Sequence, residues 1–262
     1  MNKPMTICTC DISVSVVSYR NAIEVGALVE SIERHVDHSL AKRIYVIDNA
    51  NEPLAFENLT AKYSDVEYVN AGGNAGFGKG HGMVTDRLGS KFHVIINPDV
   101  VFVEDSLSKL IDFMHDESIG MAIPKLVGED GQMLYVYRQE LTVFDMFARM
   151  FCKKLFPKRM SWVEMRDRDY TKPFLVPFAQ GSFMCIRTEL WKRIGGFDPR
   201  YFMYVEDADL CRTVNSLSKV VYAPCTQAVH KWEKGSHRNL KLLKFHVESM
   251  VRYMNKWGWR FF

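Results

Sequence analysis

Residues 12–19 read ISVSVVSY, and this stretch decides the fold that the sequence predicts. It is rich in β-branched residues, which favour a strand. The next segment, 21–35, carries its apolar residues at helical spacing. They are Ile23, Ala27, Leu28 and Ile32. A strand that runs directly into such a helix predicts a sheet whose strands are joined by crossover helices.

The same alternation continues along the chain. Short β-rich runs follow at 42–47, 66–69 and 92–96, and a helix is expected over 80–88. Strands that alternate with helices imply a mostly parallel central sheet covered on both faces. We therefore expect an α/β fold with a Rossmann-like, nucleotide-binding half.

Polar or glycine-rich residues stand at the end of each of these runs. Asp48 and Asn49 follow the second run, residues 70–73 (NAGG) the third and 97–99 (NPD) the fourth. Because ligands bind outside the carboxyl ends of the strands in open α/β sheets, a ligand site is expected at this edge.

Length and composition predict one globular unit. The 262 residues are 47% hydrophobic and 25% charged, and a net charge of +3 is too small to favour nucleic acid as a partner. We expect a single domain over 1–239, with a donor half at about 12–105 and an acceptor and catalytic half at about 106–239. A basic, aromatic tail follows at 240–262.

The most basic part of the sequence is its end. Residues 231–262 hold eight Lys/Arg and two acidic residues, so they carry +6 while the rest of the chain carries −3. A second aromatic stretch, 142–160, is also basic through Lys153, Lys154, Lys158 and Arg159. Peripheral contact with the inner membrane is expected, with packing of the tail on the core as the alternative. The tail residues expected to take part are Phe245, Tyr253, Trp257, Trp259, Phe261 and Phe262.

The six cysteines form no CxxC pair and show no regular spacing, which argues against a zinc site and against a disulfide framework. No apolar run reaches the roughly 18 residues that span a bilayer, and the N-terminus lacks an apolar signal core. We expect a cytoplasmic protein that is peripheral on the cytoplasmic face of the membrane.

Residues 72–80 (GGNAGFGKG) place five glycines in nine positions ahead of the expected helix. This composition suits a backbone that approaches a phosphate closely at a helix N-terminus. The alternative is a tight connection that needs positive φ angles. The pattern is neither a GxGxxG directly after the first strand nor a GxxxxGK[ST] loop, so dinucleotide and P-loop sites are disfavoured.

Two acidic segments are candidates for chemistry. Asp99 follows an apolar strand, where a hard divalent cation would bridge it to phosphate oxygens. Its alternative role as a helix N-cap suits Asp105 better. Further along, Glu206, Asp207 and Asp209 crowd three carboxylates into four positions, which can raise the pKa of a carboxylate and make it a base. The alternative is a solvated helix start.

His230 is a candidate ligand for a metal beside anionic phosphates. It follows an expected strand at 220–224 and precedes Lys231, Lys234 and Arg238. The alternative is an ordinary structural histidine.

Taken in order, these segments resemble the inverting glycosyltransferases of family 2, which have the GT-A fold, and within them the rhamnosyltransferase-like branch that builds bacterial surface polysaccharides. The resemblance covers residues 12–240, and the ordered set is far more specific than any one motif. The motifs are 17–21 (VSYRN), 48–50 (DNA), 74–78 (NAGFG), 97–99 (NPD), 180–184 (QGSFM), and 196–198 (GFD) with 206–210 (EDADL).

The resemblance implies a GT-A fold with a nucleotide-binding half fused to an acceptor-binding half. It also implies transfer of a sugar from a dTDP- or UDP-sugar, with L-rhamnose from dTDP-L-rhamnose expected. The acceptor would be a hydroxyl of a glycan or of a polyprenyl-diphosphate-linked glycan, in O-antigen or other surface polysaccharide synthesis. A divalent cation, Mg²⁺ or Mn²⁺, would be the cofactor.

The same resemblance assigns roles to residues. Asp207 would be the base, Asp99 and His230 would hold the metal, and Asp48 would hydrogen-bond the pyrimidine. Asn97 stands where many relatives have a second aspartate, which leaves strict metal dependence open. The other donor-side residues are Tyr19, Asn49, Asn74, Gly76, Phe77, Gly78, Asn97 and Arg238. The acceptor-side residues are Gln180, Gly181, Ser182, Glu206 and Asp209.

Two competing interpretations exist. A sugar-nucleotide pyrophosphorylase normally carries a glycine- and arginine-rich loop after its first strand, whereas residues 18–22 here read SYRNA. A protein that binds a nucleotide sugar without turnover is the second alternative, and the presence of both Asp99 and Asp207 argues against it.

Overall fold

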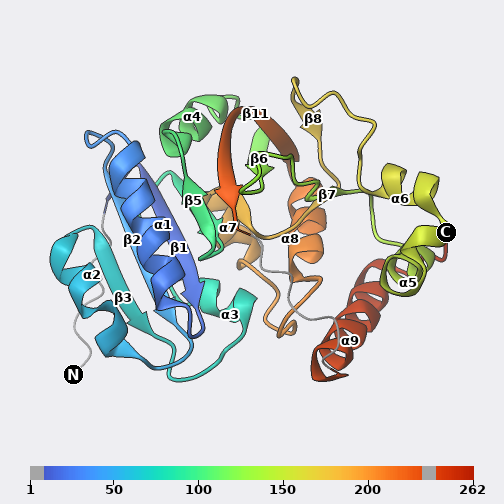
Figure 1. Cartoon of the computed structure of the whole chain (residues 1–262), viewed down its shortest axis with the longest axis horizontal. Coiled ribbons are helices and arrows are strands. Elements are labelled where there is room, and N and C mark those ends of the chain that lie inside the picture. The colour runs from blue at the N-terminus through green and yellow to red at the C-terminus, as the bar shows by residue number, and fades with distance from the viewer. Residues whose placement is uncertain (1–8, 232–239) are drawn as a thin grey trace.

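The chain folds around one large mixed sheet in the computed structural model, which describes residues 9–231 and 240–262 (Figure 1). Along the sheet the strands lie in the order β3-β2-β1-β4-β10-β6-β11-β5, and β8 pairs with β11. The strands are β1 Ile12–Ser18, β2 Lys42–Asp48, β3 Val66–Asn70, β4 Phe92–Ile96, β5 Val100–Phe102, β6 Ile119–Val127, β8 Phe174–Leu175, β10 Phe183–Arg187 and β11 Lys219–His230. A small second sheet joins β7 Tyr137–Arg138 to β9 Phe178–Ala179.

Strands β1 to β4 are parallel, and β10 then enters antiparallel beside β4. All residues of β4 are buried, so both faces of the sheet are covered there. In Figure 1, α1 crosses over β1 and β2. The helices are α1 Ala22–His35, α2 Glu57–Lys62, α3 Phe77–Gly82, α4 Ser106–Phe113, α5 Val143–Phe151, α6 Pro157–Val163, α7 Thr188–Ile194, α8 Glu206–Asn215 and α9 Leu240–Trp257. The short 3₁₀ turns are η1 Pro53–Phe56, η2 Thr85–Arg87 and η3 Lys153–Leu155.

The expected helix over 80–88 is wrong in its position. Helix α3 begins at Phe77, inside the glycine-rich segment, and only the 3₁₀ turn η2 follows it. The oxygen Oγ of Ser15 lies 2.7 Å from Nδ1 of His81, and this buried contact ties α3 to β1. Tertiary contacts therefore hold a helix that glycine alone would disfavour.

The tail expected at 240–262 is largely a helix that packs on the protein. In α9, Tyr253 and Met254 are buried, and Phe245 contacts Phe202 at a ring distance of 4.9 Å. The alternative, packing of the tail on the core, therefore holds for Tyr253, while the half-buried rings of Phe245 and Trp257 also contact other parts of the chain. Within residues 9–231 and 240–262, no helix has the length and apolarity needed to cross a bilayer.

Candidate active site

The ends of four strands bring the candidate donor residues to one edge of the sheet. Ser18 is in register with Asp48, and Asp48 with Asn70. Val16 is in register with Ile96, so the segment 97–99 continues past the same edge. The segments that the sequence analysis predicted to bind a ligand therefore lie together at this edge, because the strands before them are parallel.

Asp48 shapes the turn after β2. Its side chain is fully buried, and its carboxylate accepts hydrogen bonds from the backbone N–H groups of Ala50, Asn51 and Glu52 and from the hydroxyl of Tyr68. A carboxylate with these partners can contact a base only by exchanging one of them. The structure thus places Asn51 and Glu52, rather than the Asp48 side chain, at the surface of this edge.

Asn49 links that turn to the glycine-rich loop. Its Nδ2 donates to the carbonyl oxygen of Gly76 at 3.1 Å, and Oδ1 of Asn74 accepts from the Gly76 N–H at 3.0 Å. Gly76 has a φ of 86°, and a Cβ there would lie 2.3 Å from the carbonyl oxygen of Phe202. Only glycine fits this close approach.

Tyr19 lies open at the same edge. Its ring is 49% exposed, and the guanidinium of Arg20 lies 5.5 Å from the ring centroid. The Tyr19 N–H donates to Oδ1 of Asn21, which fixes the start of the loop. An exposed ring on a fixed loop can stack on a planar base.

Asp99 and His230 form the candidate cation site. Oδ1 of Asp99 lies 3.2 Å from Nε2 of His230, and the N–H of Lys231 donates to the Asp99 carbonyl. The pairing of β5 with β11 produces this contact, because Val100 is in register with His230. His230 is therefore the last residue of β11, a strand that runs well beyond the expected 220–224.

These two side chains fit a divalent cation as a partial ligand set. In the part of the chain that the structure describes, no group of three or more His, Cys, Asp or Glu side chains could hold a metal. A carboxylate oxygen and an imidazole nitrogen would leave the remaining positions of an octahedral ion to water and to a diphosphate. Arg238, which the sequence also proposed for the donor, lies outside the described residues.

A two-residue bridge joins the cation pair to the candidate base. The carbonyl of Ser182 accepts from the N–H of Asn97 at 2.9 Å, and the N–H of Gly181 donates to Oδ2 of Asp207 at 3.1 Å. Phe77 packs against this bridge, since a Cβ on Gly181 would lie 3.2 Å from its ring. Donor and acceptor segments thus meet at Gly181 and Ser182.

Asp207 lies in the first turn of α8, and the backbone just before this helix is constrained. Tyr204 and Val205 have φ values of 70° and 67°, in the left-handed region that non-glycine residues rarely adopt. Helix α8 then begins at Glu206. The side chain of Asp207 stays partly exposed, and its Oδ1 accepts from the N–H of Ala208 at 2.9 Å.

Glu206 and Asp207 have different electrostatic surroundings. Burial, reinforced by the charge of Asp207, raises the pKa of Glu206 to about 8, and its Oε2 has no hydrogen-bond partner among the described residues. Burial also raises the pKa of Asp207, but the N–H groups of Ala208 and Gly181 and the charge of Arg149 oppose this rise. Near neutral pH the pair can therefore keep its proton on Glu206 and its charge on Asp207.

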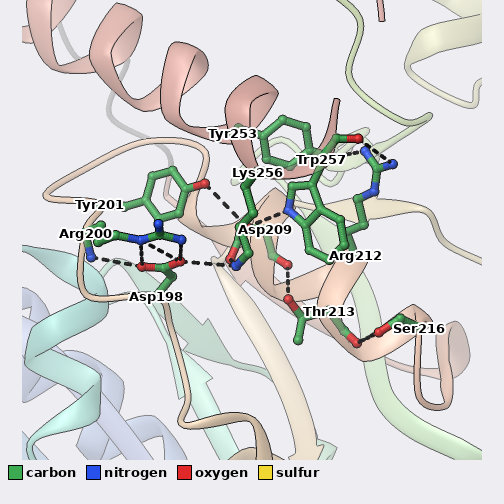
Figure 2. A network of polar contacts seen from close by, with 10 residues as sticks. All are labelled: Asp198, Arg200, Tyr201, Asp209, Arg212, Thr213, Ser216, Tyr253, Lys256 and Trp257. Atoms are coloured by element: carbon green, nitrogen blue, oxygen red, sulfur yellow. Dashed lines mark hydrogen bonds and ion pairs between the residues drawn. The ribbon is translucent and has the colours of Figure 1, made fainter. Parts of the chain in front are cut away.

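Asp209 has a different set of partners, shown in Figure 2. Its Oδ1 accepts from Nε1 of Trp257 at 2.7 Å, and its Oδ2 accepts from Nζ of Lys256 at 2.7 Å. Tyr201 adds a hydroxyl contact to Oδ1 at 3.4 Å. The expected acceptor-binding role does not fit this geometry, because two residues of helical rotation turn Asp209 away from Asp207 and onto α9.

We predict that Asp209→Asn lowers the free energy of unfolding by about 2–3 kcal/mol, because it leaves the partly buried Lys256 cation without its nearer carboxylate. Urea denaturation measures this change. The control is Glu248→Gln within α9 itself, whose exposed pair with Lys244 one turn away should contribute less than about 1 kcal/mol. Equal stability of the two variants would contradict the anchoring role.

The sequence interpretation missed two residues near the site. The carbonyl of Phe202 accepts from the N–H of Phe77 at 3.3 Å and closes the glycine-rich loop. Arg149 of α5 lies close enough to Asp207 to lower its pKa. The basic character of 142–160 was the available signal for Arg149, but its separation in sequence from Asp207 concealed the electrostatic interaction between them.

Comparison with known proteins identifies relatives of this chain. The family model for glycosyltransferase like family 2 matches residues 10–254. Rhamnosyltransferase WbbL of Escherichia coli (strain K12) is 24% identical over 254 residues, covering 91% of this chain and 90% of that protein. The N-acetylglucosaminyl-diphospho-decaprenol L-rhamnosyltransferase of Mycobacterium tuberculosis is 24% identical over 202 residues, covering 71% of this chain and 66% of that protein.

Solved structures agree on the fold. The crystal structure of GalNAc-T7 with UDP, GalNAc and Mn²⁺ has a TM-score of 0.67 at 15% identity, and the match covers 95% of this chain and 48% of that chain. The mannosyltransferase PcManGT from Pyrobaculum calidifontis, in complex with GDP-Man and Mn²⁺, has a TM-score of 0.65 at 14% identity. This match covers 97% of this chain and 67% of that chain. These similarities confirm the expected GT-A fold.

Proposed function

This chain belongs to glycosyltransferase family 2, and from that premise we propose that it transfers L-rhamnose from dTDP-L-rhamnose to a hydroxyl of a glycan, with inversion at the anomeric carbon. The acceptor we propose is a polyprenyl-diphosphate-linked glycan of surface polysaccharide synthesis. Asp207 is the proposed base, and Asp99 with His230 the proposed cation ligands.

One observation carries the proposal. Gly181 bonds to Asp207 while the adjacent Ser182 bonds to Asn97, two residues before Asp99. Displacement at an anomeric carbon needs a base on one side of the sugar and a stabilised leaving group on the other. The Gly181 and Ser182 bridge links the segments that carry the candidates for both functions, which supports this assignment.

The relatives support the choice of sugar and acceptor. One matched protein is a rhamnosyltransferase, and another is by its name an L-rhamnosyltransferase that acts on N-acetylglucosaminyl-diphospho-decaprenol. The structures matched by fold contain Mn²⁺ with UDP or GDP-Man, which supports a divalent cation in this chain. A bound cation would neutralise the departing nucleoside diphosphate.

In the proposed reaction, the acceptor hydroxyl gives its proton to the carboxylate of Asp207 as its oxygen bonds to the anomeric carbon. The bond from that carbon to the diphosphate breaks, and the nucleoside diphosphate leaves with the electron pair. A single displacement inverts the anomeric centre, so no second carboxylate nucleophile is needed. Glu206, which holds its proton near neutral pH, leaves Asp207 as the available base.

The proposal is tested with the purified protein, Mn²⁺ or Mg²⁺, a panel of nucleotide sugars and a short-chain polyprenyl-diphosphate N-acetylglucosamine. We expect release of dTDP and a disaccharide product whose anomeric configuration, read by NMR, is inverted. Product from a UDP-hexose instead would replace the proposed donor. Nucleotide-sugar binding without any joined product would overturn the transferase proposal in favour of a binding protein.

A further inference from the structure

One end of the molecule exposes large apolar side chains from three segments. Figure 1 shows α5, α6 and the C-terminal residues together at this end. Backbone hydrogen bonds join α5 to the C-terminal residues, since the N–H groups of Val143 and Phe144 donate to the carbonyls of Arg260 and Phe261, and the turn η3 connects α5 with α6. We call this surface the aromatic platform. Its exposed members are Phe147, Phe151, Leu155, Trp162, Phe261 and Phe262.

The exposure of these side chains is unusual for apolar residues. Phe151 is 63% exposed, Leu155 74% and Phe262 87%. Phe147 and Phe151 lie on one side of α5, with ring centroids 5.0 Å apart, while the neighbouring Ala148 is fully buried. An apolar surface of this kind, rimmed by polar groups, marks an interaction site.

The rim of the platform is cationic. Residues 143–163 contain five Lys/Arg and one acidic residue, Asp145, which is buried and paired with Arg159. Lys154 and Lys158 are exposed, and neither forms an ion pair with any residue that the structure describes. Lys153 and Arg260 add two more exposed cations, although each contacts a glutamate.

Aromatic rings surrounded by lysine and arginine match the interface of an anionic bilayer. Tyr, Trp and Phe bury apolar surface at the headgroup level, and the cations attract acidic lipids. We propose that the aromatic platform docks this protein on an anionic membrane surface. This proposal does not depend on which sugar the protein transfers. The proposed membrane contact is formed by α5, α6 and the last four residues, whereas the sequence predicted it for the tail as a whole.

The platform also has a defined relation to the active site. Arg149 is in the last turn of α5, between Phe147 and Phe151, and its charge reaches Asp207 on α8. The helix that would lie on the lipid therefore carries a charge that acts on the candidate base.

The test is flotation of the whole protein with vesicles of phosphatidylethanolamine and phosphatidylglycerol, against vesicles of phosphatidylcholine alone. We expect salt-sensitive binding to the anionic vesicles only. The double variant Lys154→Glu with Lys158→Glu should lower the partition coefficient on the order of 1,000-fold, because the two reversals together change the local charge by four. Phe147→Ser with Phe151→Ser should weaken binding at every salt concentration.

Matched controls lie outside the platform. Leu54→Ser and Lys172→Glu change an equally exposed apolar residue and an equally exposed cation, and both should bind as the parent protein does. Transfer to a soluble acceptor should be unchanged in all these variants, which separates failure of docking from failure of the proposed function. Absence of binding to anionic vesicles, or binding that the platform variants leave unchanged, would overturn the proposal. Dimers in solution that the platform variants dissociate would instead make the platform a contact between two copies of the chain.

Discussion

Asp207→Asn is expected to lower kcat for sugar transfer by about 10²–10⁴-fold while donor binding stays nearly normal, because general-base catalysis typically contributes that factor. The acceptor hydroxyl must lose its proton as the glycosidic bond forms. Asp207 is the partly exposed carboxylate at the start of α8, and its Oδ2 accepts a hydrogen bond from the N–H of Gly181. The measurement is labelled sugar joined to acceptor, with nucleotide affinity measured separately by calorimetry.

Glu206→Gln is the matched control for this variant. Since burial keeps Glu206 protonated near neutral pH, a neutral amide replaces a neutral acid and should cost much less. Asp209→Asn should likewise retain most transfer per folded molecule, since Asp209 contacts α9. The acid limb of the pH–rate profile should lie above the ordinary aspartate range and belong to the Glu206 and Asp207 pair. Near parental transfer by Asp207→Asn would show that the base lies elsewhere.

Asp99→Ala is expected to weaken Mn²⁺-dependent binding of dTDP by more than about 10–100-fold, the cost usually seen when only an outer partner of a metal ligand is lost. Asp99 supplies the carboxylate of the candidate cation pair, and Asn97 cannot replace its charge. Titration of dTDP in the presence of Mn²⁺, and again with the cation chelated, measures the effect.

The control for Asp99 is Asp105→Ala. Asp105 is the N-cap of α4 and accepts the Ser108 N–H, as expected from the sequence, so its loss should reduce stability by about 1 kcal/mol without changing dTDP affinity. Equal dTDP affinity in Asp99→Ala and the parent protein would remove Asp99 from the cation site. A loss that is the same with and without Mn²⁺ would do so as well.

The strands could be predicted closely because their side chains carry a strong local signal. The runs at 12–19, 42–47 and 92–96 coincide with β1, β2 and β4 to within one residue, since buried parallel strands need continuous β-branched and apolar residues. The polar segments after them then had to share one edge. The pairing of Asp99 with His230 was implied instead by the resemblance to the family, because His230 ends β11 rather than one of these parallel strands.

What could not be predicted depends on contacts between distant residues. Glu206, Asp207 and Asp209 look alike in sequence, and their roles separate only because Lys256 and Trp257 reach Asp209 from α9. The extension of β11 to His230 rests on successive pairing with β6 and β5, across a register shift between Ala223 and Gln227. Neither the contact of α9 with Asp209 nor the pairing of β11 with β6 and β5 produces a periodic sequence pattern from which it could be predicted.

The left-handed backbone at Val205 affects which amino-acid substitutions this position can accept during evolution. Any valine codon becomes a glycine codon through a single base substitution, so relief of the strain is within easy mutational reach. The strain amounts to about 1–3 kcal/mol, and burial of a valine side chain contributes about 1.5–3 kcal/mol. Val205 is only 7% exposed, so the two contributions nearly cancel. Glycine would therefore gain little stability, and it would loosen the residue that precedes the helix of the candidate base, so the strained valine has no easy stabilising replacement by glycine.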